Sequence, residues 1–285
     1  MTGAVASTAP LPPRVELLRP WGRWGLRATA ITYLLLVIVA PLSAVLADGF
    51  GTGLAAFLRD VTSPVALSAL KLTIFVAVVT TVINAVMGTL TAYALVRYDF
   101  PGRAVLNGIV DLPFAIPTLV TGVMLVVLYG PQRLVGQWLQ SQGIEVIFAT
   151  PGIVLAMLFV TYPFVVRTVQ PVLIGAEVRQ EEAAFSLGAS KWTAFRRILL
   201  PTLAPALISG CLLSFARALG EFGSVVIVAG NIPNVTLTAP VHIYGQIESQ
   251  NQQGASAMST VLLALSFVLM LIIDTMQARR TVDRG

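Results

Sequence analysis

Charged side chains are scarce in this chain, and the few that lie inside apolar stretches are the first residues whose chemistry needs an explanation. Charged residues make up 11% of the 285 residues, and hydrophobic residues make up 56%. Arg217 and Glu221 are four residues apart in one apolar stretch, a spacing that places them one turn apart on a helix face. Burial of either charge alone would be costly, whereas a pair largely neutralises itself. The spacing predicts an ion pair and leaves two roles open: fixing helix packing, or helping an anion across an apolar interior.

Asp111 and Arg167 are two further charges inside apolar stretches. Because a carboxylate is a poor ligand for an anion, Asp111 is expected to pair with a cation, and Arg167 and Arg103 are the candidates. Arg167 alternatively extends towards the nearer end of its stretch, which is also what we expect of Lys71. Asp111 and Arg167 therefore join Arg217 and Glu221 as candidates for an intramembrane pair or a transport path.

Enzymatic chemistry finds no support in the sequence. There is no Gly-x-x-x-x-Gly-Lys-Ser/Thr phosphate loop, so the chain is not expected to hydrolyse ATP. One histidine, His242, and one cysteine, Cys211, do not supply the ligands of a protein metal site or an intramolecular disulfide. We predict a non-catalytic protein without a cofactor of its own. An ion-coupled secondary transporter is the alternative from another class, with Asp111 or Glu221 as its titratable residue.

The elements that must position these charges are membrane helices. The mean hydropathy of +0.84 is far above that of a water-soluble domain, and a window of about 19 residues finds six spans. They are predicted at Ala28–Ala47, Ala66–Val96, Val105–Gly130, Gly152–Gly175, Leu203–Ala229 and Ala257–Met276. Residues 1–27 form a basic tail expected to be disordered. The first span is long enough to cross a bilayer and is favoured as an uncleaved helix; a cleaved signal peptide is the alternative.

Basic residues define the predicted orientation. With the N-terminus in the cytoplasm, fourteen basic residues fall inside and only Arg59 and Arg133 fall outside. The inner set is Arg14, Arg19, Arg23, Arg27, Arg97, Arg103, Arg167, Arg179, Lys191, Arg196, Arg197, Arg279, Arg280 and Arg284. This asymmetry follows the positive-inside rule and predicts that both termini are cytoplasmic. It also accounts for the pI of about 9.8, so no nucleic-acid partner is expected.

One charged segment, EEAAFSLGASKWTAFRRILLPTLAPA from Glu181 to Ala206, interrupts the apolar sequence between the fourth and fifth spans. Residues 176–187 suit one short helix, which Gly188 ends because glycine adopts the left-handed conformation without steric cost. Ser190 is a suitable N-cap for a second helix, whose apolar face carries Trp192 and Phe195, followed by Ile198 and Leu199. Such a segment could lie on lipid headgroups or dock another protein. The small pair Ala183-Ala184 favours docking.

The same segment resembles the signature loop of the membrane subunits of binding-protein-dependent ABC importers. That signature is written EAA---G---------I-LP, and every specified position agrees. The matching residues are Glu182, Ala183, Ala184, Gly188, Ile198, Leu200 and Pro201. The resemblance implies that the loop forms two coupling helices that insert into a groove of an ATP-binding subunit. It also makes a secondary transporter much less favoured.

Other motifs resemble the sulfate/thiosulfate permeases within this family. They are the segments YDFPGR from Tyr98, DLPFAIPT from Asp111, PFVVRTVQP from Pro163 and SFARALGEFG from Ser214. The sequence is most similar to the T-type subunit, which pairs with a homologous W-type subunit. Molybdate and tungstate permeases share the Gly-Glu-Phe-Gly run, so a permease for those oxyanions is the alternative.

The resemblance implies an all-α polytopic protein of the bacterial plasma membrane, with the six-helix transmembrane domain of a type I (MetI-like) ABC importer. It implies a first helix at 28–47, a permease core at 65–276 containing the coupling loop 176–202, and a cytoplasmic tail at 277–285. The implied partners are the W-type permease, two ATP-binding subunits that hold ATP and Mg²⁺, an extracytoplasmic sulfate-binding protein and the lipid bilayer. This chain would then form half of the pathway of an ATP-driven sulfate/thiosulfate importer.

Overall fold

The computed structural model describes residues 20–175 and 178–282, and all regular structure in these ranges is helical. Residues 1–19, 176–177 and 283–285, and with them most of the predicted N-terminal tail and the end of the C-terminal one, lie outside the described residues. The helices up to residue 129 are α1 Pro20–Leu34, η1 Leu35–Val39, α2 Ala40–Gly49, α3 Leu54–Val61, α4 Pro64–Arg97, α5 Arg103–Ala115 and α6 Thr118–Tyr129. The remainder are α7 Leu134–Ser141, α8 Thr150–Gly175, α9 Val178–Ser186, α10 Lys191–Ala194, η2 Phe195–Leu199, α11 Leu200–Leu219, α12 Gly223–Val228, α13 Ala239–Glu248 and α14 Gln252–Val282.

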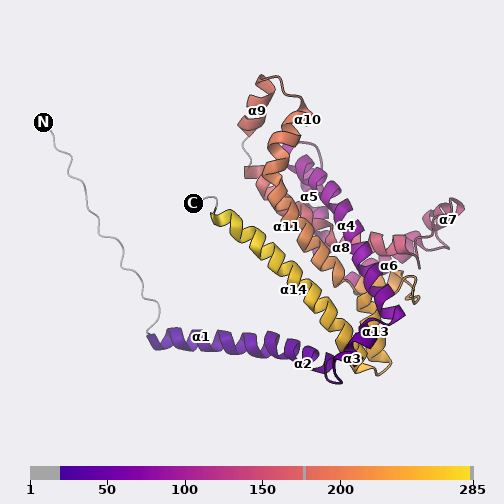
Figure 1. Ribbon diagram of the computed structural model, residues 1–285. Coiled ribbons are helices and arrows are strands. Elements are labelled where there is room, and N and C mark those ends of the chain that lie inside the picture. Colours follow the sequence, from indigo (N-terminus) through magenta and orange to yellow (C-terminus); the bar gives the residue numbers. More distant parts are fainter. Residues whose placement is uncertain (1–19, 176–177, 283–285) are drawn as a thin grey trace. The chain divides into compact units, whose positions relative to one another are not determined.

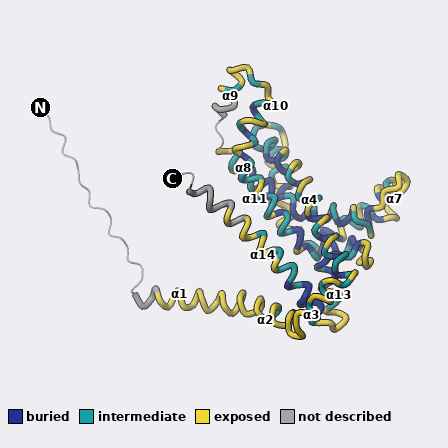
Figure 2. Tube along the Cα trace, viewed as in Figure 1, coloured by how far each residue is buried: buried dark blue, intermediate teal, exposed yellow. Residues whose placement is uncertain are grey.

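The chain divides into two compact units, Met1–Ala47 and Asp48–Gly285. The described part of the first unit is one long helix, and the most apolar window of Trp24–Gly49 is not buried by the chain at all (Figure 2). A helix that is apolar all round needs lipid or another protein to cover it. Its π turn η1 comes just before Pro41, where the wider turn keeps the proline ring clear of the preceding carbonyl groups.

Three long helices, α4, α8 and α11, form the centre of the second unit (Figure 1). They approach closely because glycines lie at their crossings: a Cβ atom on Gly88 would lie 2.9 Å from Val165, and one on Gly210 would lie 2.2 Å from Thr168 Oγ1. Two clusters of fully buried side chains fill the space between the helices, one around Met157 and one around Val166. The short helices α9 and α10 lie at one end of this bundle and α13 lies at the other (Figure 1).

The predicted third span is not one helix, which corrects the expectation of a continuous span at Val105–Gly130. It consists of α5 and α6, whose axes are bent by 113°. Pro117 disfavours the helical conformation of the residue before it, and Ile116 is indeed extended, with φ −86° and ψ 126°. The described residues therefore contain five continuous helices able to span a membrane, or six spans if the bent pair is one.

The predicted fifth span, Leu203–Ala229, is also corrected. The helix begins at Lys191, in the coupling loop, and continues through η2 and α11 to Leu219. The chain then leaves the helix and begins the separate helix α12. A Cβ atom on Gly223 would lie 2.1 Å from Thr118 Oγ1, so α12 crosses the start of α6 in close contact. Gly220, by contrast, has no atom within 4 Å of its Cβ position and only ends the helix.

Candidate functional site

The turn at Gly188 has the predicted geometry. Gly188 has a φ of +83°, and α9 ends two residues before it. The Ala189 N–H donates to the Ala184 carbonyl at 3.0 Å, and the Gly188 N–H donates to the Phe185 carbonyl at 2.9 Å. These two bonds are those of a Schellman motif, which satisfies carbonyl groups at a helix end. Ser190 then caps the second helix by accepting the Thr193 N–H at 3.2 Å, as predicted.

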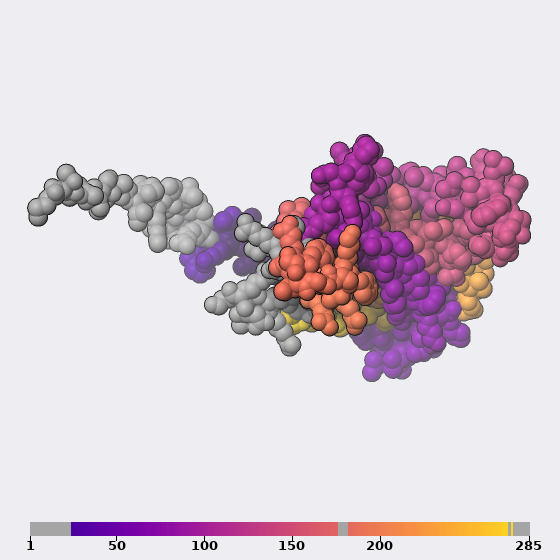
Figure 3. Space-filling view, turned by 90° about the horizontal axis from the view of Figure 1, so that it is seen from above, coloured from indigo at the N-terminus to yellow at the C-terminus, as the bar shows by residue number. Residues whose placement is uncertain are grey.

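The loop carries an exposed apolar surface formed by Phe185, Leu187 and Trp192. Leu187 is 89% exposed and Trp192 is 67% exposed. Trp192 stacks on Phe195 with ring centroids 5.7 Å apart, and Phe195 packs onto the buried cluster at this end of the bundle. Figure 3 looks onto this end, and the loop lies at the front of the bundle. Large apolar side chains standing out from a membrane bundle mark an interaction surface, for another protein or for lipid.

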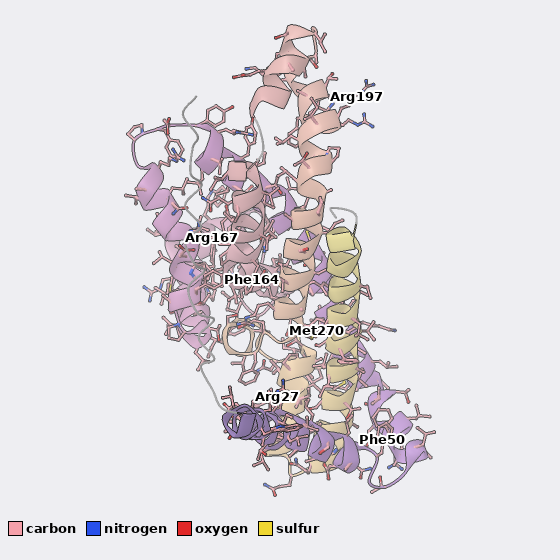
Figure 4. The ribbon with its side chains drawn as sticks, turned by 90° about the vertical axis from the view of Figure 1, so that its left-hand side faces the viewer. Arg27, Phe50, Phe164, Arg167, Arg197 and Met270 are labelled. Carbon is pink, nitrogen blue, oxygen red and sulfur yellow. The ribbon has the colours of Figure 1, made fainter. Side chains whose placement is uncertain are left out.

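The remaining signature residues divide between this surface and the bundle. Glu182, Ala183 and Pro201 are exposed, while Ala184, Ile198 and Leu200 are half-buried. In the second helix Leu199 is buried, Phe195 and Ile198 are half-buried and Arg196 and Arg197 are exposed, as predicted, whereas Trp192 of the same predicted face is exposed. Figure 4 shows Arg197 projecting from the helix close to the loop. The loop therefore offers one apolar and basic surface whose backbone is fixed by two caps.

Arg217 and Glu221 form the predicted ion pair, with Arg217 Nη2 2.7 Å from Glu221 Oε2. The pair does not lie along one helix, because α11 ends at Leu219 and Glu221 is in the following turn. The Glu221 side chain is 1% exposed, and its Oε1 accepts the Ser224 N–H at 2.9 Å and the Ser224 hydroxyl at 2.8 Å. Glu221 thus joins the end of α11 to the start of α12, which supports the packing role left open by the sequence.

Asp111 pairs with Arg167, and this decides between the two predicted partners. Arg167 Nε and Nη2 donate to the two carboxylate oxygens of Asp111 at 2.7 and 2.6 Å. Arg167 also donates to the Asn107 side chain and carbonyl at 2.9 and 2.8 Å, and to Gln170 Oε1 at 2.5 Å. Arg103, the other candidate, pairs with Asp99 at 2.5 Å. The alternative that Arg167 extends towards the end of its stretch was wrong, because its guanidinium bonds Asn107 and Asp111 and so joins α8 to α5.

Three of these polar partners, Asn107, Gln170 and Ser224, were missed in the sequence. Their spacing carried a signal: Asn107 is four residues before Asp111, and Gln170 is three residues after Arg167, so each pair shares a helix face. Ser224 follows Glu221 by three residues, a common spacing for a side chain that accepts the backbone N–H at a helix start. None of the three is charged, so a search for intramembrane charges passed over them.

The α13 end carries a buried histidine. His242 lines a cavity of about 500 Å³ together with Asp60, Gln246 and Asn251. Burial lowers the pKa of His242 below its ordinary value. Lys71 is exposed and lines a different cavity, beside Asn234. Among the residues that the structure describes, no group of three or more His, Cys, Asp or Glu side chains could hold a metal ion.

These features define a multi-pass α-helical membrane protein that pairs internal charges and exposes a capped two-helix loop at one end of its bundle. Comparison with known proteins leads to the same class. Residues 84–282 match the model of the family "Binding-protein-dependent transport system inner membrane component". The chain belongs to this family.

Curated relatives include proteins described as sulfate permeases. The chain is 47% identical over 251 residues to the "Probable sulfate transport system permease protein cysT" of Nephroselmis olivacea, covering 88% of each chain. It is 42% identical to the sulfate transport system permease protein CysT of Synechocystis sp., covering 90% of this chain and 88% of that one. Identity to the protein of that name in Escherichia coli K12 is 41%, with 88% and 91% covered.

Solved structures support the fold. A chain of a bacterial alginate ABC transporter, crystallised with an alginate pentasaccharide-bound periplasmic protein, superposes with a TM-score of 0.75 over 92% of this chain and 95% of its own. The sequence identity is 18%, so this likeness concerns the fold alone. The expected fold of an ABC importer transmembrane domain is therefore confirmed.

Proposed function

We propose that this chain is a permease subunit of an ATP-driven sulfate/thiosulfate importer and forms half of its translocation pathway. The observation that carries the proposal is 41–47% identity, over most of both chains, to relatives described as sulfate permeases. The chain itself would be non-catalytic, with ATP and Mg²⁺ held by the ATP-binding subunits. Its partners would be those two subunits, a homologous W-type permease and an extracytoplasmic sulfate-binding protein.

The loop at residues 178–199 would be the contact with an ATP-binding subunit. Its exposed Phe185, Leu187 and Trp192 would enter an apolar groove, and Ala183 would let the partner backbone approach closely. The second helix of the loop runs without interruption into α11, a helix of 29 residues in all. Movement of the loop would therefore be transmitted directly into the bundle, because a continuous helix moves as a rigid element.

In the proposed orientation the α9 end is cytoplasmic and the α13 end is extracytoplasmic. The positive-inside asymmetry supports this orientation, since the basic residues Lys191, Arg196 and Arg197 gather at the α9 end. It places the exposed loop where an ATP-binding subunit would be found. The loops at the opposite end would then contact the binding protein, with residues 231–238 as one candidate surface.

Reconstitution tests the proposal directly. The chain is co-expressed with the homologous permease and the ATP-binding subunit, and the complex is placed in proteoliposomes. ATP is enclosed in the vesicles and the binding protein is added outside. We expect ATP-dependent uptake of radiolabelled sulfate and an ATPase rate stimulated by sulfate-loaded binding protein. Parallel runs with thiosulfate, molybdate and tungstate identify the anion. Uptake of molybdate or tungstate with no response to sulfate would replace the proposed substrate by the alternative.

A further inference from the structure

The Arg167 cluster lies well inside the apolar part of the bundle. Asp111 is eight residues from the start of α5, and Arg167 is eight residues from the end of α8. At 1.5 Å per residue, both lie about 12 Å from the helix ends. Charges at such depth face a bundle interior or a water-filled cavity rather than lipid. Because the Asp111 side chain is 51% exposed in the isolated chain, this face of α5 meets water or a second protein in the assembled transporter.

A cavity of about 370 Å³ opens beside the cluster. It is lined by Leu95, Arg103, Ala104, Asn107 and Gln170. Two of these, Asn107 and Gln170, accept hydrogen bonds from Arg167, and Arg103 adds a second guanidinium. Among the described residues Arg103 pairs with the highly exposed Asp99, so solvent weakens the attraction between the two. The cavity wall therefore carries one guanidinium and two amide groups; the amide oxygens accept from Arg167, and an oxyanion would be held by the guanidinium and amide N–H groups.

We propose that Arg167, with Asn107 and Gln170, is a transit site for a divalent tetrahedral oxyanion, and that Asp111 occupies this site when the anion is absent. The inference rests on the proposed function and adds a location to it. Arg167 presents Nε and Nη2 to two oxygens of one carboxylate at 2.7 and 2.6 Å. Two oxygens of sulfate can accept the same pair of N–H groups, because the guanidinium fork matches planar and tetrahedral oxyanions alike.

The resident carboxylate makes the site weak, as a transit site must be. A binding site that is free for only a fraction of the time has its affinity reduced by that fraction. If Asp111 holds Arg167 for about 99% of the time, the dissociation constant for the anion rises about 100-fold. The anion then exchanges with Asp111, so Arg167 is never left buried without a partner and the anion is not trapped.

Removal of the resident carboxylate gives the decisive test. The full-length chain is purified in detergent free of anionic lipid, and radiolabelled sulfate binding is measured by equilibrium dialysis. We expect Asp111→Asn to bind sulfate at least 10-fold more tightly than the unchanged chain. Asp48→Asn is the matched control, since it makes the same charge change at an exposed residue outside the cluster. It should alter the affinity for sulfate less than 2-fold. The double variant Asp111→Asn, Arg167→Gln should lose the gain.

Three results would overturn the site. They are equal affinities in Asp111→Asn and Asp48→Asn, a gain that persists in the double variant, and a gain for phosphatidylglycerol vesicles without one for sulfate. The last result would assign the cluster to lipid headgroups.

If Asp111→Asn does not fold, Gln170→Glu replaces it. Glutamate keeps the acceptor for Arg167 and adds a charge that repels the anion. Sulfate uptake by the complex should then fall at least 10-fold at an unchanged melting temperature. Unchanged uptake would refute the site. Absence of uptake in the unchanged complex would instead count against the proposed function.

Discussion

The Arg217–Glu221 pair gives the sharpest stability prediction. Glu221 is 1% exposed and accepts three contacts, from the Arg217 guanidinium and from the Ser224 N–H and hydroxyl. Removing one partner of a buried ion pair costs about 3–5 kcal/mol. Two features reduce this cost in free energy: Arg217 is 33% exposed and partly solvated, and glutamine keeps an acceptor for Ser224. We therefore expect Glu221→Gln to lower the free energy of unfolding by about 2 kcal/mol.

The double variant Arg217→Met, Glu221→Gln should recover at least half of this loss, because it leaves no charge without a partner. The assay is unfolding of the purified chain by sodium dodecyl sulfate in mixed micelles, followed by circular dichroism. Glu145→Gln is the control, since it makes the same chemical change at an exposed loop residue and should shift stability by less than about 0.5 kcal/mol. Ser224→Ala removes one bond to Glu221 and should cost about 1 kcal/mol.

An unaltered unfolding curve for Glu221→Gln would refute the packing role. A double variant that loses as much as the sum of the single variants would show that the two residues do not interact. A third outcome separates structure from transport. If the double variant folds and assembles normally but takes up no sulfate, Arg217 also contributes to the path.

Three further predictions concern the loop, the α13 end and the specificity of the permease. Gly188→Val forces a φ of +83° on a β-branched residue, at a cost of about 1–2 kcal/mol or more. It should uncouple ATP hydrolysis from uptake when both rates are measured. Gly175→Val is the control, because its Cβ position has open space around it, and it should leave the coupling unchanged. Since the pKa of His242 is lowered, stability should be complete above about pH 6.5 and fall below it, a loss that His242→Gln abolishes in thermal melts from pH 7.5 to 5. Calorimetric titration of sulfate into the complex without binding protein should give millimolar affinity or weaker, about −4 kcal/mol, because the outer loops offer an anion only Arg59 and Arg133; micromolar affinity would contradict this.

Local signals made the coupling loop predictable from sequence. Gly188 is the C-cap of one helix and Ser190 is the N-cap of the next, and both functions depend on residues within a few positions. The apolar face of the second helix followed from period 3.6 alone. The ends of α4 and α8 fell within a few residues of the predicted spans, because proline and the fall in hydropathy mark them. The role of the loop in binding an ATP-binding subunit stays a prediction.

The bends between helices could not be predicted, because the average hydropathy of a segment does not depend on the direction in which its helix runs. Prolines lie inside α8 at Pro163 and Pro171, and that helix continues through both. At Pro117, by contrast, two consecutive residues are extended and the chain turns by 113°. In a membrane both outcomes are allowed when neighbours satisfy the freed backbone groups. Which one occurs depends on the packing of α6 against α12, and that packing joins residues about a hundred positions apart.

Pairing of internal charges places a limit on how this chain can handle a divalent anion. Arg167 and Arg217, two guanidiniums inside the described helices, each contact a carboxylate. An unpaired arginine in a low-dielectric interior would hold a divalent anion so strongly that release would be slow. Of the two pairs, only Arg167–Asp111 has a half-exposed carboxylate and a polar cavity beside it, whereas Glu221 is fully buried and committed to α12. Exchange with an anion is therefore open to Arg167 and closed to Glu221, so variants at Asp111 should act on transport and variants at Glu221 on folding.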